Sequence, residues 1–132
     1  MLVTYTARTH LIDGHSEGGQ YELQLQLSAA DPEDHWIGDE VTSDDGAVTE
    51  VEEHRVDRIW SFTVGPYVVA DEPAIDEWFF SVLDRSQFTF DVYGTSGSPD
   101  DPKTGVMVTK NRRIRWLGPQ HREFSFRVRE VG

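Results

Sequence analysis

The chain has 132 residues, no cysteine and a formal net charge of −12 at pH 7. This length suits a single domain spanning residues 1–132, and the lack of cysteine excludes disulfides, thiolate metal sites and cysteine nucleophiles. The acidic balance argues against a specific nucleic-acid-binding surface, and no apolar run reaches the roughly 20 residues that a membrane-spanning helix needs.

The charge is unevenly distributed along the chain. The first 102 residues carry 4 basic and 22 acidic side chains, whereas residues 103–132 carry 8 basic and 2 acidic ones. One interpretation is a solvated acidic surface beside a basic sheet face. The other is that an acidic face of one copy contacts a basic face of the next, and a head-to-tail contact of this kind builds rings.

Two strands are predicted near the N-terminus, over residues 2–11 and 20–29. In the second, Tyr21, Leu23 and Leu25 alternate with polar residues, which predicts one buried face and one solvated face. The polar, glycine-rich segment between these strands cannot bury itself. We therefore expect the two strands to pair as neighbours in an antiparallel sheet.

Residues 31–53 give a weaker pattern with many acids and few core residues. The segment 31–34, Asp-Pro-Glu-Asp, is typical of a turn or loop, and Asp45-Gly46 is typical of a tight hairpin turn. We expect strands over 36–42 and 47–53 that form an exposed acidic hairpin, either a protein-contact arm or a mobile flap.

Firm alternation returns over residues 55–64 and is followed by Gly65-Pro66, which predicts the end of a strand. The next stretch contains the one convincing helix. Asp71 is its expected N-cap, and Pro73 is tolerated in the first turn. One apolar stripe, from which only Phe80 departs, recurs at helical spacing. It consists of Ile75, Trp78, Phe79, Val82 and Leu83.

The remaining sequence supplies the sheet on which this helix has to lie. A strand is expected over 88–92, a surface loop over 94–102, and closing strands over 105–110, 114–117 and 123–131. Together, these elements predict a mainly β fold. It is an antiparallel β-sandwich, or a partly open barrel, of seven or eight strands with one α-helix packed on it.

No arrangement of residues points to catalysis. The five histidines are scattered without metal-ligand spacing, and no nucleophile elbow, P-loop or dinucleotide motif is present. With 24 acids in the chain, a pair of catalytic carboxylates can be neither excluded nor inferred. We therefore expect no catalytic residue, no cofactor and no metal.

We expect some residues that lie outside the apolar patterns of the core to form a protein interface. Trp36 and Trp116 lie out of phase with any apolar face, so each is a candidate interface anchor. The basic cluster around Trp116 is short and belongs to an acidic protein, which favours pairing with an acidic neighbour. The predicted oligomer interface is Trp36, Arg112, Arg113, Arg115 and Trp116.

The order of these features resembles the small tail-tip proteins of long-tailed bacteriophages, in the distal tail and minor tail protein group. The segment 49–60 precedes a helix that contains aromatic residues. After the helix, residues 88–95 read Phe-Thr-Phe-Asp-Val-Tyr-Gly-Thr and are followed by a loop that contains Pro-Asp. The last strand, at 124–131, reads Phe-Ser-Phe-Arg-Val-Arg-Glu-Val. The resemblance covers most of the chain as a pattern of elements and carries no catalytic signature.

This resemblance implies a virion structural protein, made in the bacterial cytoplasm, with no catalysis, cofactor or metal. Copies of it, six or three, are expected to form a ring at the distal end of the tail tube, between tube and tip proteins. The genome would pass through the lumen without specific binding. The alternatives are a carbohydrate- or receptor-binding module that uses Trp36, Trp116 and the loops, and a small acid–base enzyme.

Overall fold

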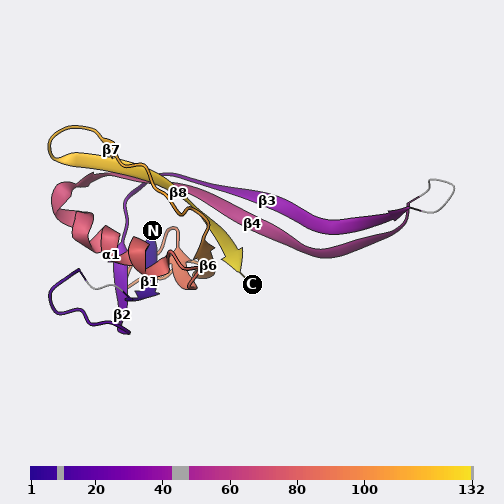
Figure 1. Ribbon diagram of the computed structural model, residues 1–132, viewed down its shortest axis with the longest axis horizontal. Helices are drawn as coiled ribbons and strands as arrows, with labels where there is room; N and C mark the ends of the chain where they lie inside the picture. The colour runs from indigo at the N-terminus through magenta and orange to yellow at the C-terminus, as the bar shows by residue number, and fades with distance from the viewer. Residues whose placement is uncertain (9–10, 43–47, 132) are drawn as a thin grey trace.

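The computed structural model describes residues 1–8, 11–42 and 48–131, with the side chains of 35–57 outside that description. These residues form one antiparallel sheet of eight strands and one α-helix (Figure 1). The strand order is β2–β1–β5–β6–β8–β4–β3, and β7 pairs separately with β8. Since β2 and β3 end this order, the sheet is open, and the predicted mainly β fold with a single helix is confirmed.

The elements have the following bounds: β1 Leu2–Thr6, β2 Gln20–Gln24, β3 Leu27–Thr42, β4 Val48–Val68, a 3-10 turn Val69–Asp71, α1 Glu72–Val82, β5 Phe88–Asp91, β6 Lys103–Met107, β7 Arg115–Trp116 and β8 His121–Val131. The first two strands pair as expected, with Tyr5 opposite Tyr21. However, β1 ends at Thr6 instead of continuing to residue 11, because the chain leaves the sheet to contact the helix.

Strands β3 and β4 are much longer than predicted. Residues 31–34 are not a turn: they continue β3, and Asp31, Pro32, Glu33 and Asp34 lie opposite Ser61, Trp60, Ile59 and Arg58 of β4. Proline is tolerated there because β3 is an edge strand. The predicted Asp45-Gly46 turn lies outside the described residues.

Strand β4 also continues past Gly65-Pro66, where the sequence predicts its end. The Gly65–Pro66 peptide bond is cis, and the register with β8 shifts between Val64 and Tyr67. Gly65 has a φ of 134°, and a Cβ on it would lie 2.7 Å from Glu123 Cβ. Glycine thus allows β4 to bulge against β8 and then resume pairing as far as Val68.

The helix packs its predicted stripe against the sheet. Ile75, Trp78, Phe79 and Val82 are buried, and Phe80 is exposed as expected. Asp71 occupies the N-cap position but makes no side-chain capping hydrogen bond. Trp78 meets Phe126 edge-on at a centroid distance of 5.2 Å, an arrangement that aromatic pairs prefer. The core is therefore an aromatic layer between α1 and the inner face of β8 and β5.

Candidate interaction surfaces

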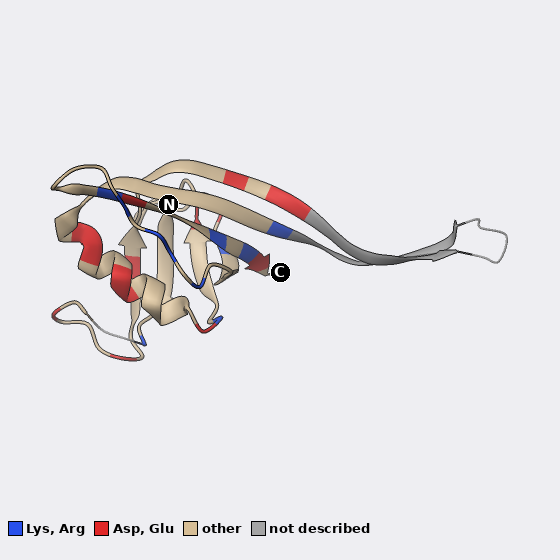
Figure 2. Ribbon diagram, turned by 45° about the horizontal axis from the view of Figure 1, so that its top comes forward, with Lys and Arg blue, Asp and Glu red and all other residues tan. Residues whose placement is uncertain are grey.

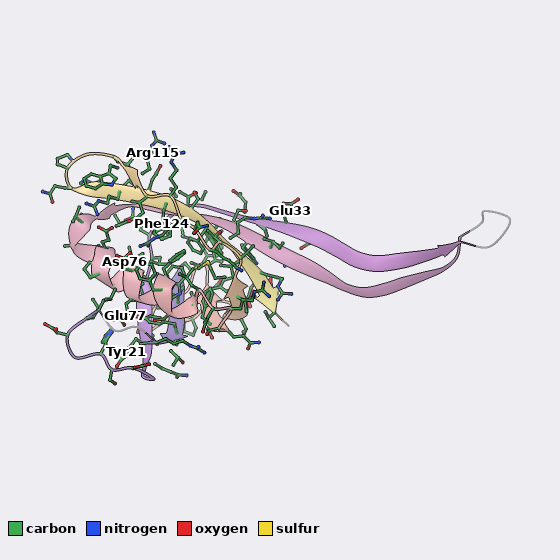
Figure 3. All side chains as sticks on the ribbon, viewed as in Figure 1. Tyr21, Glu33, Asp76, Glu77, Arg115 and Phe124 are labelled. Carbon is green, nitrogen blue, oxygen red and sulfur yellow. The ribbon has the colours of Figure 1, made fainter. Side chains whose placement is uncertain are left out.

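Glu77 is a charged side chain with no exposed surface, and it holds the segment from Leu11 to His15 on the helix. Its carboxylate accepts hydrogen bonds from Tyr5 Oη at 2.8 Å, from the amides of Leu11 and Ile12 at 2.9 and 3.0 Å, and lies 2.6 Å from His15 Nδ1. The His15 ring stacks on Tyr21 at a centroid distance of 3.6 Å. Figure 3 shows Glu77 and Tyr21 on this side of the helix.

This arrangement suits a structural anchor better than a catalytic base. Burial disfavours the charged form of Glu77, but the hydrogen bonds from His15, the two amides and Tyr5 outweigh burial and lower its pKa. Burial, together with the bond to Glu77, raises the pKa of Tyr5, which keeps its hydroxyl protonated. Four partners occupy the lone pairs of the carboxylate, so none is left to accept a substrate proton.

Asp91 is a second buried carboxylate, and it shapes the 94–102 loop. It is 2 % exposed and accepts hydrogen bonds from the amides of Asp100 and Asp101 at 2.9 and 3.1 Å. Burial acts against ionisation, but these amide hydrogen bonds outweigh it and lower the pKa of Asp91. Asp91 ends β5 and is used inside the fold, where it holds the loop that follows.

Two arginines, Arg112 of the segment after β6 and Arg122 of β8, form ion pairs with acids of the helix. Arg112 forms an ion pair with Asp76, and its guanidinium lies over the Phe79 ring at 4.7 Å and the Phe124 ring at 5.0 Å. Arg122 pairs with Glu72. The Arg112 side chain is only 8 % exposed. The structure therefore uses Arg112, a predicted interface residue, within the fold, where it has little surface left for a partner.

The other predicted interface residues have different positions. Arg113 and Arg115 are exposed, and Arg115 lies 3.4 Å from Glu123. Trp116 is 65 % exposed, with the Arg122 guanidinium 4.0 Å from its ring centroid. The Trp36 side chain lies outside the described residues. The structure brings Arg115 and Trp116 together on β7, at the end of β8 far from the C-terminus, and their role as an interface stays a prediction.

The most prominent surface is the projecting end of the β3–β4 hairpin, which we call the arm: residues 34–42 of β3 and 48–58 of β4. Beyond the pairing of Ile59 with Arg129, β4 leaves β8 and pairs with β3 alone among the described strands. Figure 1 shows the arm extending away from the body. At about 3.3 Å per residue it is roughly 35 Å long, more than twice the radius of gyration of a compact domain of 100 residues, which is about 13 Å.

A groove of about 510 Å³ lies at the open side of the sheet, between β2 and the start of α1. Its lining includes Leu23, Leu25, Val64 and Ile75, with Asp71 as its one charged residue. Within the part of the chain that the structure describes, no three His, Asp or Glu side chains gather closely enough to hold a metal ion. No described helix is long and apolar enough to cross a membrane.

No protein-family model matches the chain, and no curated protein matches its sequence. The arm and the surfaces described above are therefore the features from which a function can be inferred.

Proposed function

We propose that this chain is a structural subunit that assembles with copies of itself into a ring, as a virion protein at the distal end of the tail tube of a long-tailed bacteriophage. The arm is the observation that supports assembly. An isolated two-stranded hairpin is marginally stable in water, and its open edges attract other chains. An arm of this length is therefore best explained by a partner that covers it.

Charge segregation supports the same proposal. Asp and Glu dominate the part of the chain that contains the arm, whereas Lys and Arg dominate residues 103–132. Figure 2 shows Lys and Arg along β8 near the C-terminus and on the segment that precedes β7. Two complementary surfaces at different places on one subunit favour a head-to-tail contact, which closes into a ring when the rotation allows. The resemblance to tail-tip proteins suggests that such a ring would belong to the tail of a bacteriophage particle.

A shortened arm tests assembly directly. Ile37 lies opposite Arg55, so an Asn-Gly pair replacing residues 38–54 can close the hairpin with a tight turn. We expect the native chain to give a discrete oligomer in native mass spectrometry and a ring in electron micrographs, and the shortened chain to give a folded monomer. A native chain that remains a monomer at high concentration contradicts the proposal.

The assignment to a virion needs its own experiment. Antibodies against the chain should label the distal end of the tail in particles produced by the phage that encodes it. Particles without the chain, in a preparation whose tails are intact, contradict this part of the proposal while leaving self-assembly untouched.

A carbohydrate- or receptor-binding module is the second candidate, and the exposed ring of Trp116 is the observation that favours it. Aromatic rings with a free face are suitable platforms for apolar sugar faces, but Arg122 already covers Trp116 from one side. A glycan array separates the two candidates: specific signals that disappear in Trp116→Ala favour the module, and an empty array favours the subunit.

A further inference from the structure

A second groove, on the outer face of the sheet, has a composition unlike the rest of the protein. Ile59, Arg129 and Val106 lie side by side in one row across β4, β8 and β6. The groove along this row has a volume of about 370 Å³. Its full lining is Ile59, Arg85, Val106, Met107, Val108, Lys110 and Arg129. We call it the basic groove.

Its lining carries positive charge only, although Glu33 of β3 lies opposite Ile59 and continues the same row beyond the lining. Three of its seven lining residues are cationic, namely Arg85, Lys110 and Arg129, and none is acidic. Arg127 is exposed two positions before Arg129 on β8, so it lies on the same face of the sheet. Val108 is 39 % exposed and contributes apolar surface. An apolar floor with basic walls, on a protein of net charge −12, suits an acidic segment that also carries apolar residues.

The outer half of the arm, residues 38–42 and 48–53, has that composition. Its five charged residues are all acidic: Asp39, Glu40, Glu50, Glu52 and Glu53. Val41 and Val51 interrupt them. The register places Asp39 directly opposite Glu52, and like charges at directly opposite positions destabilise an antiparallel pair. The sequence of this half of the arm thus contains acids and no base, and cations of a partner would offset that charge.

We propose that the outer half of the arm of one subunit binds the basic groove of the next subunit. This inference rests on the proposed function and names the surface that the arm covers. Arm and groove are different surfaces of one chain, so each subunit donates one contact and accepts another, and the assembly is head-to-tail. The arm, roughly 35 Å long, extends beyond its own body far enough to lie along the outer face of a neighbour.

The strength of such a contact should depend on ionic strength. A single exposed ion pair contributes little, so the contact needs several of them together with burial of the apolar floor. Salt screens exposed charges over about 8–10 Å at physiological ionic strength. Raising the salt concentration should accordingly shift the oligomer toward monomer.

Charge reversal on the two surfaces provides the test. One variant carries Arg85→Glu and Lys110→Glu in the groove, and the other carries Glu40→Lys, Glu50→Lys, Glu52→Lys and Glu53→Lys on the arm, so that both surfaces change the sign of their net charge. Each alone should lose the oligomer, whereas an equimolar mixture should regain contacts between the two variants, because each variant's arm then complements the other's groove. These contacts close a ring if the number of subunits is even and give open alternating oligomers if it is odd. The charge-retaining variant Arg85→Lys with Lys110→Arg is the matched control and should assemble like the native chain.

The outcomes separate this inference from the proposed function. If the native chain assembles and the shortened arm does not, but the groove reversal assembles normally, the arm binds elsewhere and this inference is overturned while the proposed function stands. Loss of assembly in both variants without recovery in the mixture also overturns it. Binding of a short DNA duplex or of inorganic phosphate that the groove reversal abolishes, with assembly unchanged, would reassign the groove to phosphate groups.

Discussion

Asp76 and Glu77 are consecutive residues of α1, yet their carboxylates fasten two segments on opposite flanks of the helix. Asp76 pairs with Arg112 after β6, and Glu77 holds the segment from Leu11 to His15 after β1. Figure 3 shows Asp76 on the side of Phe124 and Glu77 on the side of Tyr21. One turn of helix thereby fixes two of the long connections of the body in place.

Removing the charge of Glu77 should destabilise the fold. Glu77→Gln keeps the shape of the side chain, but its amide NH₂ group would face groups that donate hydrogen bonds to Glu77 in the native chain. Buried hydrogen-bonding groups would then be left unsatisfied. We expect a loss of about 2–4 kcal/mol in the free energy of unfolding, measured by urea denaturation. Glu17→Gln, on an exposed position of the same segment, should stay within about 0.5 kcal/mol of the native chain. Equal effects of the two substitutions would show that Glu77 is no anchor.

The contribution of Glu77 should disappear in acid. Its pKa in the fold is lowered from an ordinary value of 4.5. A lowered pKa means that the folded state binds this proton less readily than the unfolded chain, so the stabilisation is complete above pH 4.5 and is lost as pH falls through the folded pKa. The stability difference between the native chain and Glu77→Gln should thus be largest at neutral pH and shrink in acid. Denaturation midpoints of both proteins across that range measure it, and a difference independent of pH would contradict the assignment.

Sequence patterns predicted the parts of this fold that depend on local alternation. Phe124, Phe126 and Val128 face inward on β8, and Val3 and Tyr5 face inward on β1, because a strand with one wet face shows its burial in every second residue. The helix was predictable for the same reason, since its stripe recurs at helical spacing.

Pairing between distant segments overrides local signals in the parts that the sequence did not predict. Asp31 to Asp34 have turn composition, yet β4 supplies a partner strand that keeps them extended. Glu77 lies off the apolar stripe and reads as an exposed acid of the helix, but a segment more than 60 residues earlier in the chain covers it. Only the complete topology shows that this acid is buried.

Arg112 and Arg113 provide a matched pair for the opposite flank of the helix. Arg112 is nearly buried against Asp76 and three aromatic rings, whereas its neighbour Arg113 is exposed. Arg112→Ala leaves the Asp76 carboxylate without its partner and removes packing, so it should cost about 2–4 kcal/mol in the free energy of unfolding. Arg113→Ala should change it by less than about 0.5 kcal/mol. Thermal or urea unfolding of both variants measures the contrast. Because Arg112 supports the fold, loss of assembly in an Arg112 variant is informative only if its stability is retained.

Replacing Gly105 of β6 by alanine has two opposing effects on stability. Alanine restricts the unfolded chain, which by itself would stabilise the strand by about 0.5–1 kcal/mol. A Cβ on Gly105 would, however, lie 2.5 Å from Val128 Cγ1 and 2.8 Å from Phe90 Cε1, and both side chains are fully buried in the core. Overpacking of this kind costs about 1–3 kcal/mol, so Gly105→Ala should destabilise the protein overall. Gly97→Ala is the control, since a Cβ there meets nothing within 4 Å. If the denaturant midpoint rises for both variants, β6 can move away from β8 without loss of stability. The aromatic layer would then be less tightly packed than these distances indicate.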